Sequence, residues 1–299
     1  MSHVVSLLLN GLSVGSVYAL IALGMVLVYK ATEIINFAHP GILVLGTFVA
    51  TATRVHLHWP FALAVLAGIA TGALAGAVVL EVLVRPFLRR DAVLAAGIMT
   101  IGLSILLNSL TNTWIGSQVL SLRAPFGSST LRLLGVSVPV SRVAAFCCAA
   151  LLLLALHLWL HRTPFGLEMR AAAEDAETAE MVGIRLSRVA LVAWSLAGAV
   201  AVVAGIFLVS YPTAGLDVTA TVVALQAIPA VVIGGIDSTT GAVVGGLAVG
   251  LVQTFALGYQ AELDFLGRNF ATAAPYLLML LVLLVRPAGL FGQQEAARV

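Results

Sequence analysis

Residues 189–216 read VALVAWSLAGAVAVVAGIFLVSYPTAGL and contain no Asp, Glu, Lys or Arg. A single helix needs about 20 apolar residues to cross the hydrocarbon core of a membrane. Further charge-free stretches lie at 1–29, 34–53, 55–80, 92–122, 143–161, 218–236, 238–261 and 269–285. Because backbone groups in lipid must be satisfied within each segment, the sequence predicts an all-α, polytopic transmembrane helical bundle with eight to nine membrane elements.

The composition of the whole chain agrees with a membrane location and excludes several functions. Of its 299 residues, 61% are hydrophobic and 9% are charged, whereas soluble domains carry about 25% charged residues. Lys30 is the only lysine and is not part of a Gly-Lys-Ser/Thr phosphate loop, so the chain cannot hold ATP in that way. A net charge of +2 is too small to indicate a polyanionic partner such as nucleic acid. With no carboxylate dyad or cofactor fingerprint in the sequence, we expect no catalytic residues, no cofactor and no bound metal.

The distribution of arginine predicts which loops face the cytoplasm. One arginine cluster lies at 85–90 and a second lies at 162–188. Short loops rich in Arg and Lys stay on the cytoplasmic side, so both clusters should face the cytoplasm. Residues 113–141 would then form an external loop, although that loop carries the exceptions Arg123, Arg132 and Arg142. Nine full crossings would place the N-terminus outside, and one re-entrant element would reverse that assignment.

The longest polar stretch of the chain is 162–188. Thr163 followed by Pro164 is typical of a helix start, and Gly183 is typical of a helix end. Two interpretations are open at this point. The stretch is either a solvated loop or a helix on which a cytoplasmic partner docks.

A short internal repeat marks two interruptions of the apolar pattern. The stretch SVYALIA at 16–22 recurs as TVVALQA at 221–227. An interruption follows each copy, EIINFAHPG at 33–41 and GGIDSTTG at 234–241. After each interruption the apolar pattern resumes with two glycines five residues apart. We interpret this order as two pseudo-symmetric halves with interrupted helices, within one transmembrane domain over 1–299.

Interrupted helices are candidate transport sites for a physical reason. At membrane depth, backbone groups without helical partners are tolerated only where they line a cavity or meet protein. The N-terminus of the resumed helix offers unpaired N–H donors and a partial positive charge, which suit a carboxylate. Paired interrupted segments in corresponding halves are a strong sequence pointer to a binding site. The predicted residues of the translocation path are therefore Asn36, His39, Gly41, Gly234, Gly235, Asp237 and Ser238.

Each polar candidate also has a plain structural interpretation. His39 lies among apolar residues and fits a core histidine with satisfied hydrogen bonds. Asn36 fits a cap of the resumed helix, in which Pro40 suits the first turn because its missing N–H costs nothing there. Asp237 fits a solvated charge in a short turn.

Several other motifs favour packing over chemistry. Residues 11–15 match the G-x-S-x-G nucleophile pattern, but they open an apolar helix and lack the strand–turn–helix context. We interpret their glycines as positions of close helix packing. The same role is predicted for Gly68, Gly72, Gly76, Gly241, Gly245, Gly246 and Gly250.

The cysteines and two neighbouring histidines receive similar interpretations. Cys147 and Cys148 are predicted to be small buried apolar residues. His157 and His161 are four residues apart on a helix, but no third ligand is nearby. We interpret them as markers of the membrane–water interface.

The stretch Ile35-Asn36-Phe37-Ala38-His39 resembles the INFAHG signature of the branched-chain amino-acid permease subunits of ABC importers. Similar matches run in order along nearly the whole chain, at 10–24, 85–86, 100–104, 170–188, 234–246 and 286–292. The length resembles the H-type subunit of these high-affinity hydrophobic amino-acid importers. Two departures lie at the interruptions, where Pro40 replaces a usual Gly and Asp237 replaces a usual small residue, and they leave the solute open.

The resemblance implies a subunit of a bacterial cytoplasmic (inner) membrane importer rather than an enzyme. Its implied partners are a second permease, homologous or identical, two cytoplasmic ATP-binding subunits that hydrolyse the ATP, and an extracytoplasmic solute-binding protein. The implied solutes are branched-chain or other hydrophobic amino acids, or related small solutes such as amides and urea. By the same resemblance, 162–188 is the ATPase-docking loop, with docking residues Gly166, Arg170, Ala172, Glu174, Asp175 and Gly183.

On this interpretation the first half covers 1–112 and the second half covers 189–292. The alternative is an ion-coupled secondary transporter or channel built on inverted repeats. For ion coupling only His39 and Asp237 could serve, and the charged stretch 162–188 would then have no function.

Overall fold

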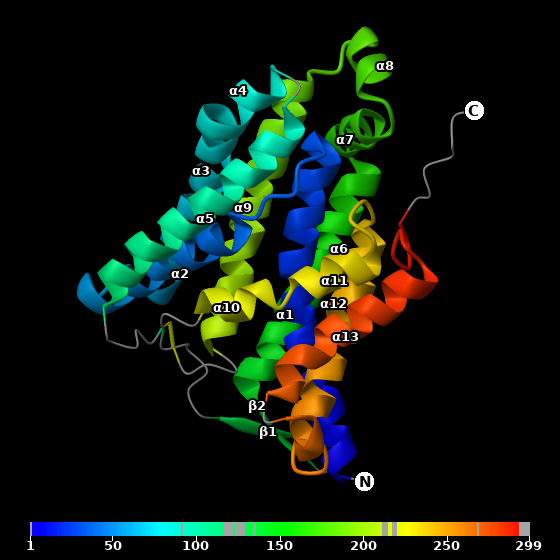
Figure 1. The fold of residues 1–299 in the computed structure, drawn as a ribbon. Coiled ribbons are helices and arrows are strands. Elements are labelled where there is room, and N and C mark those ends of the chain that lie inside the picture. The colour runs from blue at the N-terminus through cyan, green and yellow to red at the C-terminus, as the bar shows by residue number, and fades with distance from the viewer. Residues whose placement is uncertain are drawn as a thin grey trace. The chain divides into compact units, whose positions relative to one another are not determined.

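The computed structural model of the chain describes residues 2–90, 92–116, 122, 129–133, 136–210, 215–216, 220–267 and 269–292 (Figure 1). The α-helices are α1 Ser2–Thr32, α2 His39–His56, α3 Phe61–Val78, α4 Arg85–Leu88, α5 Val93–Ile115, α6 Val140–Arg162, α7 Pro164–Glu174, α8 Ala176–Met181, α9 Leu186–Ser210, α10 Ala220–Leu225, α11 Ile228–Gly234, α12 Thr239–Gly258 and α13 Phe270–Val285. A π-helix, η1 Val79–Val84, joins α3 to α4, and a 3-10 helix, η2 Asp264–Leu266, precedes α13. Strands β1 Thr130–Leu133 and β2 Val136–Pro139 pair antiparallel, with Thr130 opposite Pro139.

The described residues form an all-α membrane bundle apart from the small β1–β2 hairpin. Among them, six helices are long and apolar enough to cross a membrane: His3–Thr32, Phe61–Leu88, Val93–Ile115, Arg142–Arg162, Leu186–Val209 and Thr239–Gly258. Two shorter apolar helices cover Val223–Gly234 and Phe270–Val285. Each of the nine charge-free stretches contains helix, but only six of these helices meet the length and hydropathy of a full span.

The chain divides into two compact units that interleave along the sequence. Unit 1 comprises residues 1–26, 126–150 and 225–299, and unit 2 comprises residues 27–125 and 151–224. Helices α1, α6 and α10 therefore contribute residues to both units.

In unit 1, α1 and α12 approach closely because glycines line both helices. Gly250 lies against the backbone of Gly11 and Gly15, and Gly246 lies against the backbone of Ala19. Residues later in α1 contact residues earlier in α12, so the two helices are antiparallel. A side chain at either glycine of α12 would collide with main-chain atoms, which confirms the packing role predicted from the sequence.

In unit 2, α3 also packs closely on α9 because glycines line the contact. The backbones of Gly72 and Gly198 meet, and Gly76 lies against the carbonyl of Trp194. Gly68, one turn earlier, lies against the backbone of α2. The predicted packing role of the glycines in α3 is therefore confirmed.

The direction of this packing also bears on the two arginine-rich loops. Because α3 and α9 are antiparallel, the end of α3 and the start of α9 lie at the same end of unit 2. Residues 85–90 follow α3 and residues 162–188 precede α9. Figure 1 shows α4, α7 and α8 toward that end. The structure thus agrees with the assignment of both loops to one side of the membrane.

The helix that begins at Phe61 runs further than the charge-free stretch 55–80 indicated. It continues through η1 into α4, up to Leu88. Glu81 and Arg85 lie four residues apart on this extension and form a half-exposed ion pair. Such a pair stabilises a helix. Glu81 and Arg85 therefore lie within the helix, although the charge-free pattern predicted that the helix ends before them.

The polar stretch 162–188 folds as two short helices. Thr163 caps α7, because its hydroxyl accepts a hydrogen bond from the N–H of Gly166 at 3.1 Å. Asp175 ends α7 and caps α8, accepting from the N–H of Thr178 at 3.0 Å. Gly183 follows α8 with a φ of 91°, a conformation that glycine adopts easily. The predicted start and end are confirmed, whereas the division at Asp175 was not expected.

One of the external arginines has a clear structural role in unit 1. Arg142 lies in the first turn of α6, where its guanidinium donates to the side-chain oxygen of Asn10 on α1. The hydroxyl of Ser13 on α1 reaches the carbonyl of Arg142 at 3.5 Å. Arg142 therefore ties two helices together, which explains an arginine outside the predicted cytoplasmic loops. Arg123 lies outside the described residues.

The prediction that the cysteines are buried is wrong. Cys147 and Cys148 are both exposed on α6 and form no disulfide. In a membrane helix an apolar side chain is as well accommodated by lipid as by a protein core. The apolar pattern around them therefore indicates a membrane helix without showing which of its faces packs on protein.

Candidate functional site

The first helix break (residues 33–38) separates α1 from α2. Glu33 follows α1 with a φ of 56°, the left-handed conformation that usually calls for glycine. Its N–H still donates to the carbonyl of Tyr29 at 2.7 Å. The chain therefore ends α1 with a residue that is poorly suited to the turn it must make.

Asn36 organises the rest of the first break. Its side-chain oxygen accepts from the N–H of Ala38 at 3.0 Å, and its carbonyl accepts from the N–H of His39 at 3.2 Å. The side chain is 1% exposed. The predicted capping role is wrong, because Ala38 holds the N-cap position of α2 without a side-chain cap hydrogen bond; Asn36 instead forms the turn that leads into the helix.

A residue that the sequence did not single out holds the first break in place. Thr100 of α5 accepts from the N–H of Phe37 at 3.1 Å and contacts the carbonyl of Ile35 at 3.4 Å. A buried backbone N–H needs such a partner. Thr100 belonged to a stretch noted only for its family resemblance, and no local pattern could show that it reaches residues more than 60 positions earlier.

His39 and Gly41 begin α2 in unit 2. His39 is the first residue of the helix and is fully buried. Gly41 faces α5, where an added Cβ would lie 3.1 Å from the Cβ of Leu107. Pro40 occupies the first turn, as the sequence predicted. Asn36, His39 and Gly41 therefore lie together around the first break.

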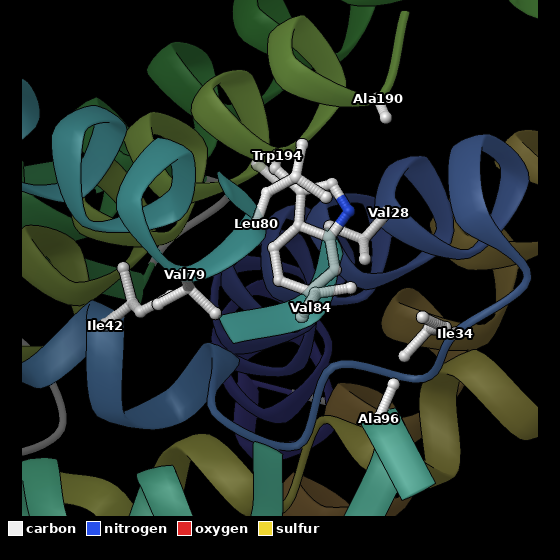
Figure 2. Close-up of a cluster of buried hydrophobic side chains, with 10 residues drawn as sticks. Val28, Ile34, Ile42, Val79, Leu80, Val84, Ala96, Ala190 and Trp194 are labelled. Carbon is white, nitrogen blue, oxygen red and sulfur yellow. The ribbon is translucent and has the colours of Figure 1, made fainter. Parts of the chain in front are cut away.

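A buried tryptophan connects the first break to the start of α9. The indole N–H of Trp194 donates to the hydroxyl of Thr32, the last residue of α1, at 3.3 Å. Figure 2 shows the ring within a cluster that also contains Val28, Leu80 and Val84. Ile34, inside the break, belongs to the same cluster. The Trp194 side chain of α9 thus shares one cluster with η1, the end of α1 and the first break.

The second helix break (residues 235–238) separates α11 from α12 in unit 1. The N–H of Ser238 donates to the carbonyl of Gly235 at 3.1 Å and closes a turn. The hydroxyl of Ser238 accepts from the N–H of Gly241 at 3.0 Å and caps α12. Gly234 and Gly241 touch through their backbones. Asp237 lies inside the turn, half-buried.

The segment after α13 folds onto the second break. The N–H of Leu290 donates to the carbonyl of Ile233 at 2.8 Å, and the N–H of Phe291 donates to that of Gly234 at 3.0 Å. These carbonyls end α11 and would otherwise have no helical partner. Gly235, with a φ of 105°, lies against Gly292. Gly235 and Gly292 belong to two motifs that lie far apart in the sequence. Both need to be glycine because their backbones are in contact.

The predicted docking residues do not form one uniform surface. Glu174, Asp175 and Gly183 are exposed on or beside α7 and α8, and Arg170 and Ala172 are partly exposed. Gly166 is buried, because it packs against the carbonyl of Leu160 where α6 turns into α7. Exposed apolar side chains accompany the charged ones, namely Leu167, Met181 and Val182.

The predicted path residues thus form two groups, Asn36, His39 and Gly41 in unit 2 and Gly234, Gly235, Asp237 and Ser238 in unit 1. Each group gathers at its own break. Among the described residues, no group of three or more His, Cys, Asp or Glu side chains could hold a metal ion. His157 and His161 stack with ring centroids 4.1 Å apart.

Six helices long and apolar enough to span a membrane, two helix breaks and a polar helical segment are typical of a multi-pass membrane permease. A comparison with protein families matches residues 7–285 to the family described as "Branched-chain amino acid transport system / permease component". The chain belongs to this family, whose members are permease subunits of ABC importers.

Individual relatives support the same membership. The chain is 30% identical to the high-affinity branched-chain amino acid transport system permease protein LivH of Escherichia coli (strain K12), over 97% of this chain and 96% of the relative. It is 30% identical to the permease protein BraD of Pseudomonas aeruginosa, over 99% and 98%. It is 29% identical to the probable LivH of Methanocaldococcus jannaschii, over 91% and 88%. No solved structure matches the chain.

Proposed function

We propose that the chain forms the translocation path of an ATP-driven importer for branched-chain or other hydrophobic amino acids, or for related small solutes such as amides and urea. The observation that carries the proposal is the family match over residues 7–285, which extends along nearly the whole chain. The high-affinity relatives match it over 96% and 98% of their own length. The importer acts in the bacterial cytoplasmic (inner) membrane.

The path is built around the two helix breaks. On this proposal α2, α10–α11 and α13 join the six long helices in the membrane, which gives eight to nine membrane elements in two pseudo-symmetric halves, 1–112 and 189–292. Each break offers backbone groups and small residues to the solute, from Asn36, His39 and Gly41 in the first and from Gly234, Gly235, Asp237 and Ser238 in the second. The buried state of Asn36 and His39 supports a role inside the protein rather than at its surface.

The segment 162–188 docks the ATP-binding subunits. Leu167, Met181 and Val182 are 61%, 80% and 73% exposed, although they lie on polar helices beyond the membrane spans. Exposed apolar side chains beside charges are typical of a surface that a partner covers. Glu174, Asp175, Arg170, Ala172 and Gly183 contribute the polar part of the interface, and Gly166 shapes the turn that presents it.

Docking is coupled to the first break through α9. The helix begins at Leu186, directly after the docking segment, and Trp194 lies about 12 Å further along its axis. A displacement of this helix end moves the indole ring against Thr32 and Ile34. ATP-driven closure of the partner subunits thereby reaches the residues that shape the path.

The complete importer also needs partners on both sides. A second permease, homologous or identical, completes the membrane part, and an extracytoplasmic solute-binding protein delivers the solute. Two cytoplasmic ATP-binding subunits supply the energy, in keeping with a single lysine that lies outside any phosphate loop.

Co-purification tests this proposal against the ion-coupled alternative. The tagged chain is expressed with the ATP-binding subunits, the second permease and the binding protein encoded beside it, and the complex is reconstituted in liposomes. We expect the ATP-binding subunits to be retained and L-leucine uptake to require ATP. Uptake by this chain alone, driven by an ion gradient, would refute the importer.

The coupling route has a separate test in the same liposomes. Trp194→Phe removes the hydrogen bond to Thr32 and should lower leucine uptake per ATP hydrolysed, with the subunits still bound. Trp114→Phe, at a side chain that is 56% exposed on α5, is the matched control and should leave the ratio unchanged. Equal ratios in the two variants would disprove the route.

A further inference from the structure

Three polar side chains from three elements meet inside unit 1. The hydroxyl of Tyr18 on α1 lies 2.9 Å from Oε1 of Gln226 and 2.8 Å from Oε1 of Gln253. The amide nitrogen of Gln253 donates to Oε1 of Gln226 at 2.7 Å. Gln253 lies on α12, and Gln226 lies between α10 and α11. We call these three residues the polar triad.

Two members of the polar triad are buried in an apolar part of the protein. Tyr18 is 2% exposed and Gln226 is 8% exposed, whereas Gln253 is half-buried. Amide and phenol groups lose hydration when they enter such a place, and they are retained there only when they form hydrogen bonds or serve a function. Residues 19–23 and 26–28 of α1, around Tyr18, are fully or almost fully buried apolar side chains.

The triad also lies near the middle of the membrane-spanning length of α1. That helix runs over 31 residues from Ser2 to Thr32, so Tyr18 is one residue past its centre. A helix of this length exceeds the hydrocarbon thickness at both ends. Solute sites of membrane transporters commonly lie near the bilayer midplane.

The triad coincides with a third interruption of the helical pattern. Residues 226 and 227 form a turn between α10 and α11. Pro229 follows in the first turn of α11 and has no N–H to donate. Irregular backbone at membrane depth is expected where it is buried in protein or lines a cavity. The interruption thus places Gln226 where polar groups of side chain and backbone converge.

The polar triad can form more hydrogen bonds than those between its three members. A phenol has one O–H, yet the Tyr18 oxygen faces the carbonyl oxygens of two amides. Reversing both amides turns both contacts into N–H donors and leaves the phenol proton to donate elsewhere. In either arrangement the three groups keep capacity for one more hydrogen-bonding partner.

We propose that Tyr18, Gln226 and Gln253 form a hydrogen-bonding site in the translocation path for the polar end of a small net-neutral solute. A zwitterionic amino acid or a primary amide carries both donors and acceptors and can exchange bonds with a phenol and two amides. An uncharged triad binds such a solute without the strong attraction that would hold an ion, so the solute can also leave. This proposal rests on the proposed transport function and adds a site to it.

Access from water tests the site without knowledge of the solute. Gln253→Cys is made in the assembled importer after Cys147 and Cys148 are replaced by Ser, and a small hydrophilic methanethiosulfonate is the probe. Ala256→Cys is the control, because Ala256 lies on the same helix and packs against Ala271 and Ala274 of α13. We expect Gln253→Cys to react at least tenfold faster than the control during ATP turnover. Equal, slow reaction with and without ATP would overturn the site.

Transport provides the second measurement. Tyr18→Phe and Gln253→Leu should each lower the rate of leucine uptake about five- to tenfold, the effect of losing one or two hydrogen bonds, with the complex intact and its melting temperature unchanged. Tyr259→Phe, the same change at the partly exposed tyrosine that follows α12, should have no effect. A loss of uptake that only follows a loss of folded complex would mean that the triad merely ties helices together.

The two measurements separate the site from the proposed function. Fast labelling of Gln253→Cys together with no leucine uptake by the unmodified importer would support the site and refute leucine as the solute. Leucine uptake together with slow labelling in every state would support the importer and refute the site.

Discussion

Replacing Gly250 by alanine tests whether backbone contact between α1 and α12 determines stability. The new Cβ would lie 2.7 Å from the carbonyl oxygen of Gly11 and closer still to the backbone of Gly15. Carbon atoms normally stay about 3.5 Å or more from their neighbours. Since main-chain atoms cannot rotate away, the two helices must separate by about 1 Å.

The expected size of the effect follows from two opposing terms. Overpacking of a close contact costs about 1–3 kcal/mol, and the better helix propensity of alanine offsets about 1 kcal/mol. The net loss is about 0–2 kcal/mol, which lowers a melting midpoint by up to roughly 8 °C. Heating the purified protein in detergent and measuring the fraction that stays monodisperse gives this midpoint.

Gly102→Ala provides a matched control with the opposite expected sign. Nothing lies within 4 Å of the position of its added Cβ on α5, so only the propensity term remains and the midpoint should stay equal or rise. The reasoning is refuted if Gly250→Ala and Gly102→Ala give the same midpoint.

Three further changes test single residues by the same melting assay or by binding. Glu33→Gly should raise the midpoint by the equivalent of about 1 kcal/mol, because the left-handed conformation strains a residue with a side chain; a lower midpoint would show that the Glu33 side chain stabilises the break. Thr100→Val should cost about 1–3 kcal/mol, because it leaves the N–H of Phe37 buried without its acceptor, whereas an unchanged midpoint would mean that Phe37 finds another partner. Asp175→Ala removes the cap of α8, which is worth about 1 kcal/mol. It should weaken capture of the ATP-binding subunits in a pull-down. Glu177→Ala lies on the same helix and keeps the cap, so it is the control.

The sequence indicates the parts of the fold that depend on local patterns. Charge-free stretches predict where helices lie, because lipid imposes the same requirement on every spanning segment. Thr163 and Gly183 bound the polar helices, since caps act within a few residues. The glycines of α1 and α12 could be assigned to packing, because little else explains glycine in an apolar helix.

The remaining features depend on contacts between distant residues. Thr100 and Trp194 hold the first break, yet each lies in an apolar helix whose pattern shows no such role. Gln226 is part of the repeat noted in the sequence, but its partner Tyr18 could not be identified from that alignment. Glu81 extends a helix because Arg85 lies one turn later, whereas a count of charges predicts that the helix ends.

The contact between the segment after α13 and the second break has a consequence for biosynthesis. The carbonyls of Ile233 and Gly234 receive their donors from Leu290 and Phe291, which leave the ribosome more than 50 residues later. Until these residues are synthesised, the turn between α11 and α12 lacks both of these hydrogen bonds. Completion of the second break therefore waits for the segment after α13, and a nascent chain halted before Leu290 would lack both hydrogen bonds.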